Sequence, residues 1–202
     1  MLLRLRGRAT CAKRFRPMIF SLLRRRNPST DTIRALYGAI VAQARLPSFY
    51  AHYGVPDTVD GRFDMIVLHL FLLAHRAGRE GGALEGLVRD VTEVFCRDLD
   101  HNMREMGVGD LAVPRRMRAY VEAFYGRAEA YRAALGARDP DVLARALARN
   151  VFSVPEATGG ARRLGSYMLQ AAHALEAQPA GALKQGLLSF PDPETILTVC
   201  DD

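Results

Sequence analysis

The chain has 202 residues, of which 49% are hydrophobic and 25% are charged, with 17 Gly, 10 Pro and no Trp. This composition is ordinary for a globular protein and excludes wholesale disorder, collagen-like repeats and low-complexity architectures. The three cysteines, Cys11, Cys96 and Cys200, lie far apart and match neither a disulfide framework nor a zinc spacing. Such a cysteine pattern is typical of a protein from a reducing compartment.

The net charge of +6 belongs to the start of the chain. Residues 1–17 carry six of the 28 basic side chains and no acidic one, so the rest of the chain is balanced at 22 basic and 22 acidic residues. The body therefore gives no electrostatic reason to expect nucleic acid as a partner. Arginine greatly outnumbers lysine and alanine is plentiful, which suggests a bacterial coding sequence rich in G and C.

Residues 1–26 form a basic leader with several interpretations. It is an over-extended start, with translation beginning at Met18, or a transit-peptide-like segment, because it is rich in Arg and free of acid. The apolar stretch Met18–Leu23 precedes three arginines. This pattern is typical of a segment that binds an anionic membrane surface, and the alternative is a frayed chain terminus. No stretch of 18 apolar residues is present, so no transmembrane helix is predicted.

Helical periodicity runs through the body of the chain, and no alternating run of strand length appears. The sequence predicts an all-α fold: a single helical-bundle-like domain of about six main helices over residues 27–178, with a weakly patterned tail over 179–202. In chain order, the expected helices cover Thr30–Arg45, Arg62–Ala77, about Ala83–Met106, about Met117–Tyr131, a segment that starts at Asp139-Pro140, and about Arg162–Ala177. The helix over Arg62–Ala77 is apolar nearly all round and is therefore expected to be central.

Two long loops rich in Gly, Asp and Pro separate these helices, at Gly54–Gly61 and Gly107–Val113, and we expect both to be rigid. Charged side chains flank both loops. They cap helices and lock the loops together, or they form a recognition surface that the bundle holds in place. These charged candidates are Asp57, Asp60, Arg62, Asp64, Arg104, Glu105, Asp110, Arg115 and Arg116.

Motifs of catalysis are not found. The chain has no nucleophile elbow and no dinucleotide fingerprint, and its histidines lack metal-ligand spacing. His69 lies among Leu68, Leu70 and Phe71 and is predicted to be a hydrogen-bonded core histidine. We therefore expect a protein that is not an enzyme and that has no cofactor or metal.

Four ordered stretches carry a family resemblance. The segment GVPDTVDGRFDM over Gly54–Met65, with LHLFLL over Leu68–Leu73, resembles the ubiquinol–cytochrome c chaperone family. So do DLDHNMREMGVGDLAVP over Asp98–Pro114 and EAFYGR over Glu122–Arg127. The resemblance covers about residues 30–177 and implies a non-catalytic assembly chaperone with an all-α fold.

Mitochondrial members of that family assist assembly of the cytochrome bc1 complex by binding newly made cytochrome b, together with a small helical partner. The resemblance therefore implies cytochrome b, or another bc1 subunit, as the client, and a small helical co-chaperone. It also implies a bacterial protein in the cytoplasm, peripheral to the inner membrane. Nothing here resembles the long N-terminal extension of mitochondrial members, so the surface that binds their partner is not carried over.

A chaperone for a membrane protein needs an apolar groove with a polar rim. Five aromatic residues near the two loops could supply such a groove, although each of them is also a natural core residue, and we predict that some of them are solvent-accessible and lie near the Gly54–Gly61 loop. The five are Phe49, Tyr50, Tyr53, Phe124 and Tyr125, and Val55 and Arg127 complete the candidate set. Two other classes stay open: a helical ligand-binding or regulatory domain, and a haem-handling protein with His52, His69 or His101 as axial ligand.

Overall fold

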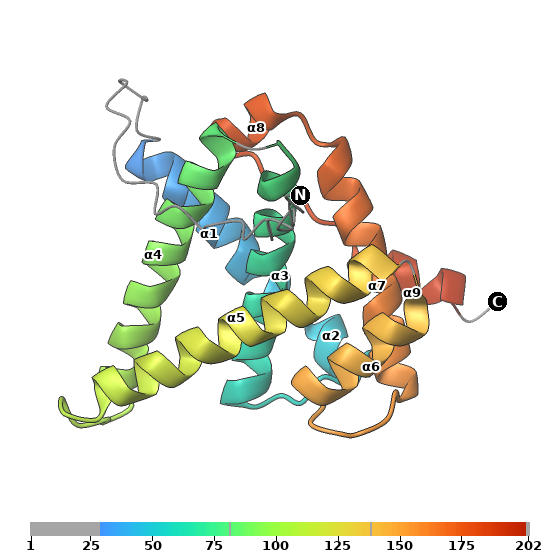
Figure 1. Ribbon diagram of the computed structural model, residues 1–202, viewed down its shortest axis with the longest axis horizontal. Helices are drawn as coiled ribbons and strands as arrows, with labels where there is room; N and C mark the ends of the chain where they lie inside the picture. The colour runs from blue at the N-terminus through green and yellow to red at the C-terminus, as the bar shows by residue number, and fades with distance from the viewer. Residues whose placement is uncertain (1–28, 81, 138, 201–202) are drawn as a thin grey trace, which may run out of the picture.

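The computed structural model describes residues 29–80, 82–137 and 139–200, and it is all-α over these ranges (Figure 1). Six helices have more than ten residues, which confirms the predicted fold class. The helices are α1 Thr30–Ala44, α2 Pro47–Ala51, α3 Val59–Glu80, α4 Ala83–Glu105, α5 Val113–Ala137, α6 Pro140–Asn150, α7 Gly159–Ala177, α8 Ala180–Lys184 and α9 Pro193–Cys200. None of the helices in the described ranges is both long enough and apolar enough to cross a membrane.

Helix α3 is the centre of the fold, as its all-round apolar pattern predicted. In Figure 1 it stands between α1 and α4 on one side and α6 and α7 on the other, while α5 crosses in front of it. One apolar cluster joins α3 to α1, α4 and α8, and a second joins it to α2, α5, α6, α7 and α9. Burial on both faces explains why Val67, Leu68 and Leu70 are all fully buried, although their side chains point in different directions around about one turn of the helix.

Polar side chains begin three of the helices as the sequence indicates. Ser29 caps α1, because its Oγ accepts a hydrogen bond from the Thr32 amide at 3.1 Å. Asp139 caps α6 through the Asp141 amide, and Pro140 takes the first helical position, as predicted. Helix α7 begins three residues earlier than predicted, because Thr158 is its N-cap.

The structure corrects the segment around the first loop. Pro47 follows the predicted first helix and begins the short helix α2, which is not among the expected helices. Helix α3 begins at Val59, inside the predicted loop, because the Thr58 hydroxyl accepts a hydrogen bond from the Gly61 amide at 3.1 Å. The loop is therefore shortened to residues 54–58.

The segment after residue 178 packs on the core, although its sequence shows only a weak pattern. Leu183 of α8 is fully buried and Ile196 of α9 is 3% exposed. The Tyr53 hydroxyl also donates a hydrogen bond to the Pro193 carbonyl at 2.7 Å. The predicted leader over residues 1–26, including its apolar stretch, lies outside the described residues.

Candidate functional site

The first loop, residues 54–58, fixes the position of the start of α3. Val55 is 2% exposed and its amide donates to the Phe49 carbonyl at 3.1 Å, so the loop is pinned to α2. Gly61 lies so close to the loop that a Cβ atom there would come within 2.0 Å of the Pro56 carbonyl oxygen. Only glycine permits this approach. The first loop thereby sets the direction of the first turns of α3.

The five predicted aromatic residues do not line one groove. Phe49 and Tyr53 are fully buried, and both pack edge-on against Tyr167 of α7. The prediction is wrong for Phe49 and Tyr53, because Tyr167, which lies more than 100 residues later in the chain, covers both rings. Tyr50 is half-buried, while Phe124 and the 68% exposed Tyr125 line a separate hollow between α4 and α5.

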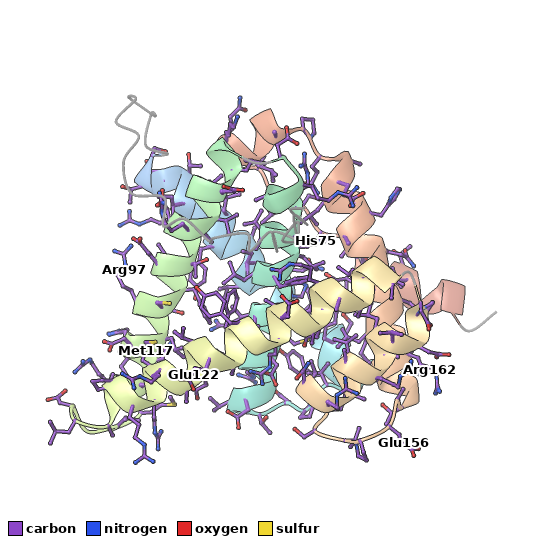
Figure 2. All side chains as sticks on the ribbon, in the orientation of Figure 1. His75, Arg97, Met117, Glu122, Glu156 and Arg162 are labelled. Atoms are coloured by element: carbon purple, nitrogen blue, oxygen red, sulfur yellow. The ribbon has the colours of Figure 1, made fainter. Side chains whose placement is uncertain are left out.

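A different apolar groove lies where α5 crosses the lower halves of α3 and α4, the region in which Figure 2 labels Met117 and Glu122. We call it the client groove, because a client is the occupant that we propose for it; its cavity volume is about 310 Å³. Phe63 is its central ring, 4.6 Å from Tyr120 and 5.9 Å from Phe95, measured between ring centroids. Its apolar lining residues are Val59, Phe63, Ile66, Phe95, Leu99, Met106 and Tyr120.

Two of these side chains project into solvent at the edge of the client groove. Val59 is 61% exposed and Met106 is 55% exposed, and because both line the same groove they offer adjoining apolar surface to a partner. Charged groups complete the rim. They are Arg45, Arg62, Asp98 and Glu105, with Asp98 accepting a hydrogen bond from the Tyr37 hydroxyl at 2.7 Å.

A second hollow, of about 440 Å³, adjoins the client groove and shares Phe63 and Tyr120 with it. We call it the Asp64 pocket. Its charged lining residues are Asp60, Asp64, Arg116 and Arg127.

Asp64 and Arg127 form a buried ion pair in this pocket, with Arg127 Nη2 2.7 Å from Asp64 Oδ1. The Arg127 guanidinium also lies over the Phe63 ring, 5.7 Å from its centroid. Burial of Asp64, which is 5% exposed, raises the pKa of its carboxyl to about 7, against the opposing effect of Arg127. Ionised Asp64 is therefore a costly group that the fold nevertheless retains.

A third hollow, of about 550 Å³, continues the surface on the other side of the client groove. It is lined by Tyr50, Asp57 and Arg62, and it shares Arg45 and Arg62 with the groove. Arg62 Nε donates to Asp57 Oδ1 at 2.7 Å, and this hydrogen bond holds the pKa of the Asp57 carboxyl below its usual range.

The structure thus brings half of the predicted residues onto one continuous surface. These are Tyr50, Asp57, Asp60, Arg62, Asp64, Glu105, Arg116 and Arg127. The other charged candidates lie in the last turn of α4, on the α4–α5 loop and at the start of α5. Arg104 pairs there with Asp100 and Asp110, and Arg115 makes no ion pair with another described residue.

The groove lining was missed by the sequence reasoning. Phe95 and Tyr120 belong to helices α4 and α5, and nothing in their local pattern separates a groove wall from a core. Val59 and Met106 offered a signal, because both fall inside the quoted motifs and stand at the ends of loops.

The histidines support the core interpretation over a ligand role for His69. Its Nδ1 lies 2.7 Å from the Met65 carbonyl oxygen and its Nε2 lies 2.8 Å from the Tyr167 hydroxyl, so both ring nitrogens are engaged. Complete burial lowers the pKa of His69 to about 4. His101 lies 3.1 Å from Glu105, and the described residues hold no cluster of three metal-ligating side chains.

Comparisons with known proteins converge on one family. Residues 51–190 match the model of the ubiquinol-cytochrome C chaperone family. The chain is 25% identical, over 118 residues, to ubiquinol-cytochrome-c reductase complex assembly factor 1 of Xenopus laevis, and the match spans 58% of each protein. It also resembles the crystal structure of the Cbp3 homolog from Brucella abortus, with a TM-score of 0.74, 41% identity, and coverage of 81% of this chain and 91% of that one. The chain belongs to the ubiquinol–cytochrome c chaperone family.

Proposed function

We propose that the protein is a non-catalytic assembly factor of ubiquinol–cytochrome c reductase, the cytochrome bc1 complex. In this proposal the client groove holds an apolar segment of newly made cytochrome b until that subunit enters the complex. The work takes place at the cytoplasmic face of a bacterial inner membrane, where such a client emerges. A small helical co-chaperone stays a prediction to which we assign no surface.

The observation that carries the proposal is the client groove itself. An amphipathic or apolar helix binds a groove through side chains spaced one turn apart, and Val59, Phe63 and Met106 offer apolar contacts over such a length. The charged rim limits the apolar area that a client can bury. A limited area favours release, which an assembly factor requires and a permanent subunit does not.

The experiment starts from a strain that lacks the gene. Its membranes are assayed for haem b absorbance and for quinol–cytochrome c reductase activity. The strain is complemented with the wild type, with the double variant Val59→Gln/Met106→Gln, and with Leu187→Gln. Leu187 is as exposed as Val59 and lies beyond α8, away from the groove, so it is a matched control.

We expect the wild type and Leu187→Gln to restore both signals and the double variant to restore much less. Loss of two apolar contacts at the edge of a groove weakens binding about tenfold or more. A photo-crosslinker at position 106 should also capture cytochrome b, whereas one at position 187 should not. Full complementation by the double variant, together with equal crosslinking from both positions, would contradict a client role for this groove.

A further inference from the structure

We propose that the Asp64 pocket binds a lysine or arginine side chain that directly follows the apolar stretch of the client. The combined surface then recognises the cytoplasmic end of a transmembrane segment, where Lys and Arg gather beside apolar residues. The inference rests on the proposed function for the nature of its client, and it adds the chemistry by which one part of that client is chosen.

The first two turns of α3 place the two halves of this surface side by side. Val59, Phe63 and Ile66 recur at helical spacing and line the client groove. Asp60 and Asp64 are one turn apart and line the pocket next to it. A single bound chain can therefore contact apolar side chains and then, within about one turn, the carboxylates.

Only one of the two carboxylates has a charged partner within the described part of the chain. Asp64 is paired with Arg127, whose Nη2 lies 2.7 Å from Asp64 Oδ1, although this contact lacks the geometry of a hydrogen bond. Asp60 is exposed at the mouth and makes no ion pair with another described residue. Repulsion between Asp60 and Asp64 disfavours ionisation of the buried carboxyl, and a cation placed between them removes that repulsion.

The two arginines of the pocket leave Asp60 without an ion partner in the described part of the chain. Arg127 is held on the inner wall by Asp64 and by the Asn150 carbonyl, 3.4 Å from its Nη2. Arg116 is exposed on the opposite wall, on α5, and has no ion pair in the described ranges. Arg116 is thus free to turn toward the carbonyl oxygens at the end of a client helix, which attract cations.

The test uses the full chain and three fluorescent peptides in detergent micelles. Each peptide is a Leu-Ala helix of equal length, followed by two Lys, two Gln or two Glu. Fluorescence anisotropy gives the Kd. We expect the Lys peptide to bind at least fivefold more tightly than the Gln peptide, and the Glu peptide to bind most weakly.

Variants of Asp60 keep the test independent of folding, because Asp60 is exposed and makes no ion pair with another described residue. Asp60→Asn should bring the Lys and Gln peptides within twofold of each other, and Asp60→Lys should make the Glu peptide the best ligand. Glu85→Gln, which removes an exposed carboxylate near the far end of α4, should leave the order unchanged.

The outcomes separate the two proposals. If all three peptides bind equally, and Val59→Gln/Met106→Gln weakens each of them, the client groove stands and the pocket has no charge preference, which overturns the inference. If binding is insensitive to the double variant, or absent, the client groove itself fails and the inference falls with it.

Discussion

Asp64 contributes to the stability of this protein in a way that depends on pH. Its carboxyl has a pKa of about 7 in the folded state and about 3.8 when unfolded, so the folded state holds a proton that the unfolded state releases. The stabilisation from the protonated group is complete below pH 3.8 and is lost as the pH rises through 7. Between pH 5 and pH 8 this loss amounts to about 2.5 kcal/mol.

His69 opposes this effect in the wild type. Its pKa is about 4 when folded and 6.5 when unfolded, so its contribution is complete above pH 6.5 and is lost as the pH falls through 4. From pH 5 to pH 8 it adds about 2 kcal/mol. The two groups act in opposite directions, and His75, whose pKa burial also lowers, acts in the same direction as His69. The loss from Asp64 is therefore offset in the wild type over this range.

Asp64→Asn removes one side of this balance. The variant leaves Arg127 without its ion partner, so its stability at any single pH combines two opposite effects, and only the shape of the profile is diagnostic. We expect its free energy of unfolding to rise by about 2 kcal/mol from pH 5 to pH 8. Urea titrations followed by circular dichroism at 222 nm measure it, with Asp31→Asn at an exposed position as control. Parallel profiles for Asp64→Asn and the wild type would refute the reasoning.

Three further variants test the packing that supports the site. Gly61→Ala should destabilise the fold by about 3 kcal/mol in urea unfolding, because its Cβ would meet the Pro56 carbonyl; a near-normal midpoint would contradict the close approach. Gly126→Ala, in open space on α5, should instead raise the free energy of unfolding by up to about 1 kcal/mol, seen as a higher melting temperature. A lower melting temperature would show an unrecognised contact at this position. Tyr167→Phe should cost about 1–3 kcal/mol by depriving the buried His69 of its partner, and unchanged calorimetric unfolding would mean that a water molecule replaces the hydroxyl.

The long helices were predictable because each repeats its apolar residues over three or more turns. The errors fall where local signals are short. Helices α2 and α8 have five residues each, too few for any period to show, and the tertiary contacts of Phe49 and Leu183 hold them in place. The start of α3 was placed too late because Thr58 is an N-cap inside a segment that otherwise has the composition of a loop.

The site was only partly predictable, for a related reason. Six of the nine charged candidates lie on one surface, because the loops hold their flanking side chains at fixed positions, whereas Arg104, Asp110 and Arg115 lie apart from it; a role of these residues in recognition stays a prediction. Phe49 and Tyr53 were placed wrongly, since a Phe or Tyr beside a loop has the same local pattern on a groove as in a core. Phe49 is a core residue because Tyr167 packs against it, and Phe95 and Tyr120 line a groove because α5 crosses α4. Neither contact can be seen in a single sequence.

The first family motif makes sense when its residues are divided by what they contact. Val55 and Gly61 face inward and hold the first loop against the start of α3. Val59, Asp60 and Asp64 instead line the client groove and the Asp64 pocket. A motif in an enzyme collects groups around a reacting atom; this one fixes the direction of a helix and then places apolar and acidic side chains along it. Substitution of the inward set should therefore weaken folding and binding together, while substitution of the exposed Val59 or Asp60 should change the choice of client and leave the free energy of unfolding close to that of the wild type.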